Sequence, residues 1–373
     1  MGIGPRVKLA RARMQMSTRE LAQQVGVSAA AISKFERGEI SPSQRTLLRL
    51  AKALSVGVEY FFREVRVKTL TPAYRKHSAL GKSVQKAIEA TIVETLERYL
   101  IVEEYMPQHA MDDIPIVTIQ SIQDAEQAAI TIRNKWELGN DPIDDLCGRL
   151  EDRGVKVIAV DAPQGFDGYS CWANDSIPVV AFNTRVSGDR QRFDLAHELG
   201  HLILRGDTFD TEKAAHRFAA ALLVPAEAAV KELGERRSNL SFEELRLLKQ
   251  EYGFSIQAWV RRAFDLGIIP QHTYGTLFRR LATMGWRTHE PGDVPREEPQ
   301  RFQLLIHQAL SENRMTPIYA SQLLREVQSV AEKPTGEQLA KAADTLIELY
   351  ATDPDLTDFA DADLEDETHD LSR

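Results

Sequence analysis

The sequence predicts a multidomain, mainly helical protein with an α+β core. Three observations support this prediction. The chain of 373 residues is long for one domain and suggests two or three. Residues 1–68 carry 13 Lys and Arg against 5 Asp and Glu, or +8, whereas the whole chain carries −9 and its remainder therefore −17. Helical patterns fill most of the sequence, and candidate strands gather between residues 155 and 183.

The composition indicates a soluble cytoplasmic protein without a membrane partner. The hydrophobic content of 43% is sufficient for a buried core, and the basic first unit favours a polyanionic partner. Cys147 and Cys171 lie in no disulfide-like or metal-binding pair, which fits a reducing compartment. No apolar run approaches the roughly 18–20 residues of a membrane span, and the N-terminus lacks a signal-peptide core.

The basic unit contains five short helical patterns bounded by typical helix-end residues. Ser17 and Glu20 have the spacing of a capping box, and Gly26 favours a left-handed helix end. Ser28 and Ser43 are the next N-caps. The predicted helices are approximately 5–14, 17–25, 28–37, 43–54 and 58–62. Two helices joined by a tight glycine-containing turn predict a helix-turn-helix.

Through "STRELAQQVGVS", "ISKFERGEISPS" and the leucine-rich helix after them, this unit resembles the Cro/cI-like (XRE) DNA-binding family. The resemblance implies a recognition helix at about 28–37, a double-stranded operator and a homodimer. Two alanines cannot make bidentate base contacts, so specificity is expected to be modest or to use DNA shape. The DNA-contacting residues implied are Gln23, Gln24, Ser28, Ala29, Ala30, Ser33, Lys34 and, toward phosphates, Arg37.

The middle of the chain predicts helices followed by a small sheet. Residues 80–105 read as a long amphipathic helix that connects domains, pairs with a second subunit or packs on its own chain. Helices are expected at about 122–137 and 142–154, and a buried strand at 155–160. Residues 168–174 and 177–183 read as strands around an Asn-Asp-Ser turn, and 177–183 is expected to be an edge strand where a peptide can add.

The stretch "FDLAHELGHLILR" (193–205) carries the pattern H-E-x-x-H in an apolar helix. His197 and His201 lie four residues apart on one helical face and can bind one metal ion. Glu198 is one step further round and is placed to take a proton from water. Imidazole ligands suit zinc, and a catalytic zinc site needs a third protein ligand besides its open position. A preserved zinc site that serves only stability or sensing is the alternative.

The third ligand is expected in the next helix, "TEKAAHRFAAALLVP" (211–225), where Glu212 and His216 are both candidates. Tyr169, Arg192 and His216 are candidate donors to a developing oxyanion, although each side chain is more often a packing or surface residue. Asp194, one turn before Glu198, either supports the site or is simply an acid on the helix face.

Residues 140–270 resemble the ImmA/IrrE metallopeptidase family through "PIDDLCGRLEDRGVKVI", the H-E-x-x-H stretch and "EKAAHRFAAALLVP". The resemblance implies a Zn²⁺ ion held by His197, His201 and Glu212, with Glu198 as catalytic base. Members of this family commonly carry Asn at the position of His216. Three roles are therefore open to His216: support of a ligand, donation to the transition state, or alternative ligation.

The C-terminal third is expected to be helical. Residues 241–289 have Trp259, Phe264, Leu277, Phe278 and Trp286 as expected core, and helices follow near 300–312, 317–330 and 336–350. The tail holds nine acids between residues 353 and 370 and predicts disorder. The predicted divisions are 1–68 (DNA-binding), 69–120 (helical linker), 121–289 (peptidase-like), 290–352 (helical region, starting with the Pro-rich linker 290–300) and 353–373 (acidic tail).

Three functions fit these features. The first is a DNA-binding regulator whose zinc endopeptidase domain cleaves a protein, either itself or a partner repressor, in response to a signal. The second is a transcriptional repressor whose zinc domain senses a ligand or partner without cleaving. The third is an antitoxin-like or phage-type repressor whose second domain mainly contacts other proteins.

Overall fold

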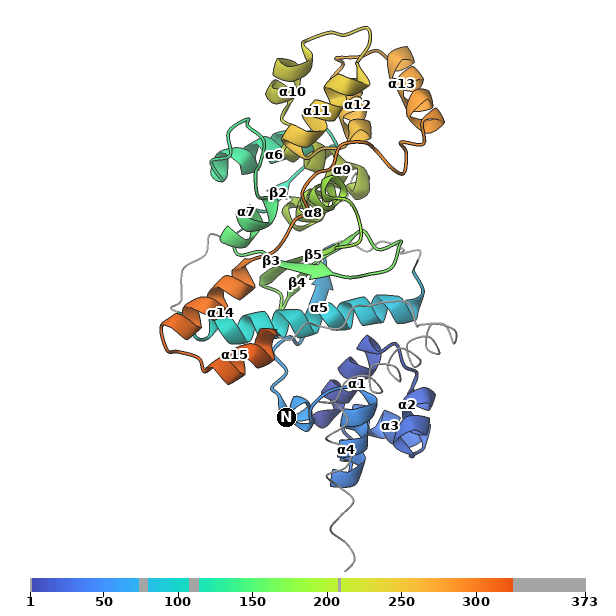
Figure 1. Ribbon diagram of the computed structural model, residues 1–373, viewed down its shortest axis with the longest axis vertical. Coiled ribbons are helices and arrows are strands. Elements are labelled where there is room, and N and C mark those ends of the chain that lie inside the picture. The colour runs from blue at the N-terminus through green and yellow to red at the C-terminus, as the bar shows by residue number, and fades with distance from the viewer. Residues whose placement is uncertain (1, 74–79, 107–113, 207–208, 325–373) are drawn as a thin grey trace, which may run out of the picture. The chain divides into compact units, whose positions relative to one another are not determined.

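The computed structural model describes residues 2–73, 80–106, 114–206 and 209–324. This part of the chain is mainly helical and contains a small mixed sheet (Figure 1). None of the helices described there is both long and apolar enough to cross a bilayer. The predicted helix at 336–350 and the acidic tail lie outside the described residues.

The N-terminal unit forms the predicted short helices around one apolar core. Ser17 and Glu20 form the complete capping box, Gly26 ends the second helix with a left-handed backbone (φ +74°), and Ser28 and Ser43 cap the next two helices. Leu21, Ile32, Leu50 and Phe61 are among the buried residues. The elements are α1 (Ile3–Arg13), α2 (Thr18–Val25), α3 (Ala29–Glu36), α4 (Gln44–Ala53) and the 3-10 helix η1 (Val58–Phe62).

The four-stranded sheet has the order β1-β4-β5-β3. Its strands are β1 (Leu70–Pro72), β3 (Lys156–Val160), β4 (Gly168–Ala173) and β5 (Ile177–Asn183); β3 and β5 are parallel and the other pairs antiparallel. The predicted hairpin turn is present, with positive φ angles at Asn174 and Asp175. The prediction that 177–183 is an edge strand was wrong, because β3 covers its outer side. A second, two-stranded sheet pairs β2 (Val117–Thr118) with β6 (Leu204–Arg205).

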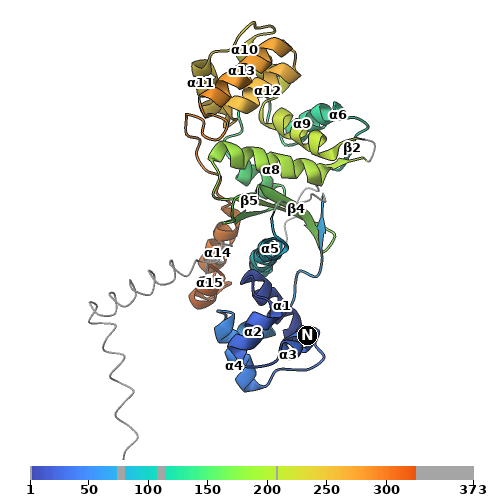
Figure 2. The same cartoon turned by 90° about the vertical axis from the view of Figure 1, so that its right-hand side faces the viewer.

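A helix packs on each face of the four-stranded sheet (Figure 2). One face packs through Ile158, Val179 and Ala181 on Ile88 and Ile92 of α5 (Lys82–Glu103). The other face packs on α8 (Gly188–Ile203), the helix that contains the H-E-x-x-H pattern. Side chains alternate between the two faces of a strand, so both apolar faces of this sheet are buried.

Helices α6 (Asp124–Lys135), α7 (Leu146–Asp152) and α9 (Thr211–Leu223) complete the layer that contains α8. Beyond them lie α10 (Ala226–Leu233), α11 (Phe242–Tyr252), α12 (Ile256–Asp265) and α13 (Gln271–Thr283) (Figure 1). Of the expected core residues there, Trp259 and Leu277 are fully buried. Phe264, Phe278 and Trp286 are half-buried and pack against the same core.

The segment 287–300 forms neither helix nor strand and is fixed by two acids with buried side chains, although the sequence suggested only a linker. Glu290 accepts hydrogen bonds from the backbone amides of Ile256 and Gln257 (2.7 and 2.9 Å). Glu297 accepts from the amide of Cys147 (2.9 Å) and from Arg192 (2.5 Å). The chain then enters α14 (Arg301–Ser311) and α15 (Pro317–Leu324), which pack on the C-terminal part of α5.

The long helix α5 also binds the N-terminal unit through buried ion pairs. Arg6 contacts Glu97, and Arg13 contacts Glu94. Glu94 also accepts a hydrogen bond from the hydroxyl of Tyr60 (2.7 Å). Among the three roles left open for this helix, packing on its own chain is therefore observed.

Candidate metal centre

The helices α8 and α9 cross closely enough to bring their polar residues together. Gly200, inside the H-E-x-x-H pattern, has no side chain to separate the helices: a Cβ there would lie 3.1 Å from Phe218 and 3.3 Å from the Cα of Ala215. Asp210 caps α9 by accepting from the amide of Lys213 (3.2 Å). The close crossing places the first two turns of α9 against the C-terminal half of α8.

The sequence candidates His197, His201 and Glu212 converge at this crossing. The Nε2 atoms of His197 and His201 lie 3.1 Å apart. A Glu212 oxygen lies 3.3 Å from the first of these nitrogens, and the other oxygen lies 4.0 Å from the second. Both histidines are buried. One nitrogen from each histidine and the two carboxylate oxygens of Glu212 thus gather at the crossing.

The geometry and chemistry of these donors fit a zinc ion. Zinc–nitrogen bonds of 2.0–2.1 Å in a tetrahedron place neighbouring ligand atoms about 3.4 Å apart. The three observed separations bracket this value. Two neutral imidazoles and one carboxylate form the His₂Glu set used by single-zinc hydrolases.

His216 lies at the same cluster. His197, Glu212 and His216 each offer a ligand atom, and these atoms lie within 4.8 Å of one another. The His216 ring has its centroid 4.4 Å from that of His197 and stacks on Phe193 at 5.5 Å. Its position is therefore compatible with ligation or with donation to a bound substrate.

Glu198 is held by the sheet on the other side of α8. Its Oε2 accepts a hydrogen bond from the hydroxyl of Ser170 on β4 (2.6 Å). Gly168 allows β4 to run close to this carboxylate, because a Cβ at residue 168 would lie 2.7 Å from the Cγ of Glu198. Ser170 and Gly168 were not predicted from the sequence. The sequence signal that could have identified them is strand alternation, since residues 168, 170 and 172 lie on the same face of β4.

The candidates Tyr169 and Arg192 do not lie at this cluster. Tyr169 packs with the core on the α5 face of the sheet, opposite to Ser170. Arg192 is buried on the far side of α8, where it donates to Glu297 and to the carbonyl of Ile143. Their candidacy as oxyanion donors was wrong, because strand alternation and helix rotation turn both side chains elsewhere.

Asp194 lies one turn before Glu198 and is almost completely buried. Burial raises the pKa of Asp194 from 3.8 to about 7, although the Arg190 guanidinium, 3.0 Å away, opposes that change. The neighbouring Asp167 raises the pKa of Asp194 further. The carboxyl is therefore held in a site that favours its neutral form.

We expect Asp194→Asn to change the pH dependence of stability. Because the folded-state pKa is above the unfolded one, the free energy of unfolding of the wild type should fall as pH rises from about 4 to about 7. The Asn variant lacks this titration, so by pH 8 its free energy of unfolding should exceed that of the wild type by up to about 4 kcal/mol. Loss of the ion pair with Arg190 reduces this difference. Denaturation by urea with a chelator present measures both proteins without zinc. Parallel pH profiles would contradict the expectation.

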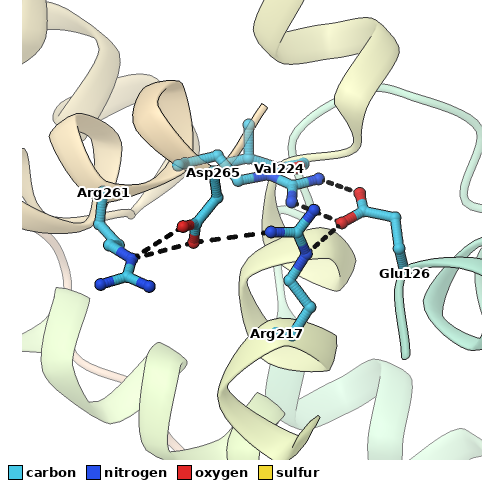
Figure 3. Close-up of polar contacts among 6 residues, drawn as sticks. Glu126, Arg217, Val224, Arg261 and Asp265 are labelled. Atoms are coloured by element: carbon cyan, nitrogen blue, oxygen red, sulfur yellow. Dashed lines mark hydrogen bonds and ion pairs between the residues drawn. The ribbon is translucent and has the colours of Figure 1, made fainter. Parts of the chain in front are cut away.

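A network of charged residues fixes α9 to its neighbours (Figure 3). Arg262 on α12, whose side chain is fully buried, makes two contacts to Glu126 on α6 and donates to the carbonyl of Val224 (3.0 Å). Arg217 on α9 donates to Glu126 (2.7 Å) and lies 3.7 Å from Asp265. The helix that carries Glu212 and His216 is thereby joined to α6 and α12.

The candidate DNA-contacting residues lie on the predicted helices of the N-terminal unit. Gln23 and Gln24 are exposed on α2, and α3 exposes Ala30 and Lys34. Ser28 also caps α3, by accepting from the amide of Ala31 (3.1 Å). Ala29 and Ser33 are half-exposed, and Arg37 is exposed and paired with Glu39 (2.5 Å).

Two family models match separate parts of the chain. Residues 7–61 match the helix-turn-helix model, and residues 150–264 match the model of the IrrE N-terminal-like domain. An XRE-type helix-turn-helix domain is thus fused to an IrrE/ImmA-like domain, which confirms the resemblances seen in the sequence.

Two relatives have local similarity to the chain. Over 79 residues it is 32% identical to the repressor protein C2 of Salmonella phage P22, covering 21% of this chain and 37% of the relative. Over 63 residues it is 38% identical to an uncharacterized transcriptional regulator in the ATPase CF(0) region of Rhodospirillum rubrum, covering 17% and 58%. The chain thus matches less than two thirds of the length of either relative.

Proposed function

We propose that the chain is a cytoplasmic DNA-binding transcriptional regulator whose second domain is a zinc-dependent endopeptidase that cuts itself or a partner regulator. The observation that carries the proposal is the convergence of His197, His201 and Glu212. Glu198 follows His197 on α8 and is held by the hydroxyl of Ser170. The two family matches and the repressor relative support the same combination of domains.

The proposed roles follow from the placement of each side chain. A zinc ion held by His197, His201 and Glu212 would polarise the scissile carbonyl and lower the pKa of water. Glu198 takes the proton from the attacking water and returns it to the leaving amide nitrogen. Ser170 positions the carboxylate of Glu198 through its 2.6 Å hydrogen bond. We assign to His216 the donation of a hydrogen bond to the carbonyl oxygen as negative charge develops, a role supported by its ring lying 4.4 Å from that of His197.

Zinc binding provides the first test. We expect the purified chain to bind one zinc ion. Glu212→Gln should weaken zinc binding by more than about 100-fold, because losing a residue that only hydrogen-bonds to a ligand already costs about 10–100-fold in affinity. Competition with a chromophoric chelator measures the affinity. Glu227→Gln, which alters an acid at the start of α10, is the matched control. Equal affinities for all three proteins would contradict the assignment of Glu212.

Proteolysis is tested by incubating the zinc-loaded chain alone and with candidate repressors, and following fragments by mass spectrometry. Chelation should stop cleavage and added zinc should restore it. Zinc binding without any cleavage would instead favour the alternative, a repressor whose zinc domain senses a ligand or partner. The position of His216 favours that alternative if its ring becomes a fourth ligand and closes the site to water.

DNA binding by α3 gives a further prediction. Arg37→Ala should weaken binding to duplex DNA uniformly across sequences and reduce the slope of log affinity against log salt by about 1, because one phosphate contact at the C-terminal end of α3 is lost. Fluorescence anisotropy between about 50 and 200 mM salt measures this slope. Lys231→Ala, at an exposed lysine of α10, should leave it unchanged. An unchanged slope for Arg37→Ala would remove the C-terminal end of α3 from the interface. Sedimentation of the same protein, with and without DNA, tests the proposed homodimer.

A further inference from the structure

The edge strand β1 belongs to the segment that follows the N-terminal unit, and it lies beside the proposed catalytic base. We name residues 66–73 the connector. The amide of Ala73 donates to the carbonyl of Ser170 on β4 (3.0 Å), and the hydroxyl of Ser170 donates to Glu198 (2.6 Å). One residue of β4 thus contacts both the connector and the carboxylate of Glu198.

The end of the connector also reaches the proposed metal ligands. Ala73 is half-buried against the core that contains α8 and α9. It lines a cavity of about 130 Å³ together with Gly200, His201, Thr211 and Ala214. The connector therefore runs along the edge of β4 and arrives next to His201.

The β4–β5 turn holds the connector in place. Asn174 accepts a hydrogen bond from the amide of Lys68 and donates one to the carbonyl of Arg66 (both 2.8 Å). The hydroxyl of Thr71 donates to Asp175 (3.1 Å). These contacts fix one register, because an edge strand otherwise slides easily along its neighbour.

We propose that the connector is an internal peptide occupying the substrate-binding edge of β4, and that an extended segment of a substrate protein adds there once the connector has left. Added strands bind through main-chain hydrogen bonds and are selected by pockets for alternate side chains. The half-buried position of Ala73 beside His201 selects a small residue at that place in the substrate. This inference rests on the proposed peptidase function.

The register of the two strands supplies a direct test. The hydrogen bonds of Ala73 with Ser170 and of Thr69 with Asn174 define hydrogen-bonded pairs, and Thr71 with Trp172 is the one between them. Pro72 faces Cys171 in a pair without ladder hydrogen bonds, so its missing N–H costs nothing. In such pairs the Cα atoms lie about 4.5 Å apart, within the range that a disulfide spans.

The lock variant is Pro72→Cys, which can form a disulfide with the native Cys171. In a zinc-loaded Glu198→Gln background, we follow binding of the fluorescein-labelled peptide RVKTLTPA, the connector sequence, by anisotropy. Oxidation should weaken binding at least about tenfold, because the binding-competent population is removed, and reductant should restore it. The double variant Pro72→Cys with Cys171→Ser should show no dependence on oxidant.

The release variant is Thr71→Pro, which removes the donor of the central hydrogen-bonded pair. It should bind the peptide at least about tenfold more tightly than wild type, because the edge of β4 is open in a larger fraction of molecules. Thr71→Val is the matched control, because it loses the side-chain hydrogen bond to Asp175 but keeps the backbone N–H donor, and it should change binding much less than Thr71→Pro. Zinc content and circular dichroism establish that all variants are folded.

With Glu198 intact, casein hydrolysis should follow the same order: fastest for Thr71→Pro and slowest for the oxidised lock. Equal peptide binding by the oxidised and reduced lock would overturn the inference, and so would casein cleavage at equal rates. A third outcome is that peptide affinity changes as expected between the lock and release variants, but no variant hydrolyses casein. That outcome would refute the peptidase function and leave the assignment of the β4 edge standing.

Discussion

Glu198→Gln should reduce peptide hydrolysis by about 10²–10⁴-fold, the usual contribution of a positioned general acid–base group. Glutamine has the size of glutamate and can still accept the hydrogen bond from Ser170. It cannot take a proton from water near neutral pH. Zinc and DNA affinities should be unchanged, because Glu198 is outside both proposed ligand sets. The initial rate of fragment formation with a defined substrate measures the loss.

Two controls separate chemistry from folding. Ser170→Ala removes only the residue that positions Glu198, so it should lower kcat with a smaller effect than Glu198→Gln and leave KM nearly unchanged. Glu243→Gln, at an exposed acid of α11, should have wild-type activity. Hydrolysis by Glu198→Gln at the wild-type rate would show that Glu198 is not the base and that another group accepts the proton.

Glu126→Ala should lower the free energy of unfolding by about 3–5 kcal/mol, the cost of leaving a buried charge without its partner. Arg262, with no exposed side-chain surface, would lose both of its carboxylate contacts. Burial alone would raise the pKa of Glu126, but hydrogen bonds and charge from Arg262 and Arg217 outweigh burial and lower it. The stabilisation is therefore present at neutral pH and is lost as pH falls through that lowered pKa. Urea denaturation of wild type and variant, at pH 7 and at a series of pH values below 4.5, measures the cost of the substitution and its loss on acidification.

The exposed ion pair of Glu243 with Arg246 provides the matched control for stability. Glu243→Ala should cost less than about 1 kcal/mol, since exposed pairs contribute little. A cost as small as this for Glu126→Ala would show that the network of Figure 3 is not needed to hold α9. A large cost accompanied by weakened zinc binding would connect the network to the placement of Glu212.

Local sequence signals predicted the helix ends of the N-terminal unit and the helical face that the two histidines share. The caps at Ser17, Ser28 and Ser43 depend on neighbouring residues alone, so they could be read directly. The spacing of His197 and His201 likewise determines their common face. Family resemblance, and not spacing, distinguished Glu212 from His216, and the structure brings both side chains to the same cluster.

Pairing between distant segments could not be predicted in the same way. The strand 177–183 has the composition of a buried strand, but its neighbours are fixed by residues 156–160 and 168–173. Strand β1 has three residues and includes a proline, so its own pattern is too short to indicate a strand. The roles of Ser170 and Gly168 depend on a helix that begins almost twenty residues later.

The anchored segment 287–300 determines where the chain can be divided. A fragment that ended at residue 289, the boundary suggested by sequence, would lack Glu297 and leave Arg192 buried without its carboxylate. It would also lose Glu290, which accepts from the first amides of α12. A fragment of the IrrE-like domain intended for isolated expression should therefore extend at least to residue 300, and its shorter counterpart should be the more easily degraded of the two.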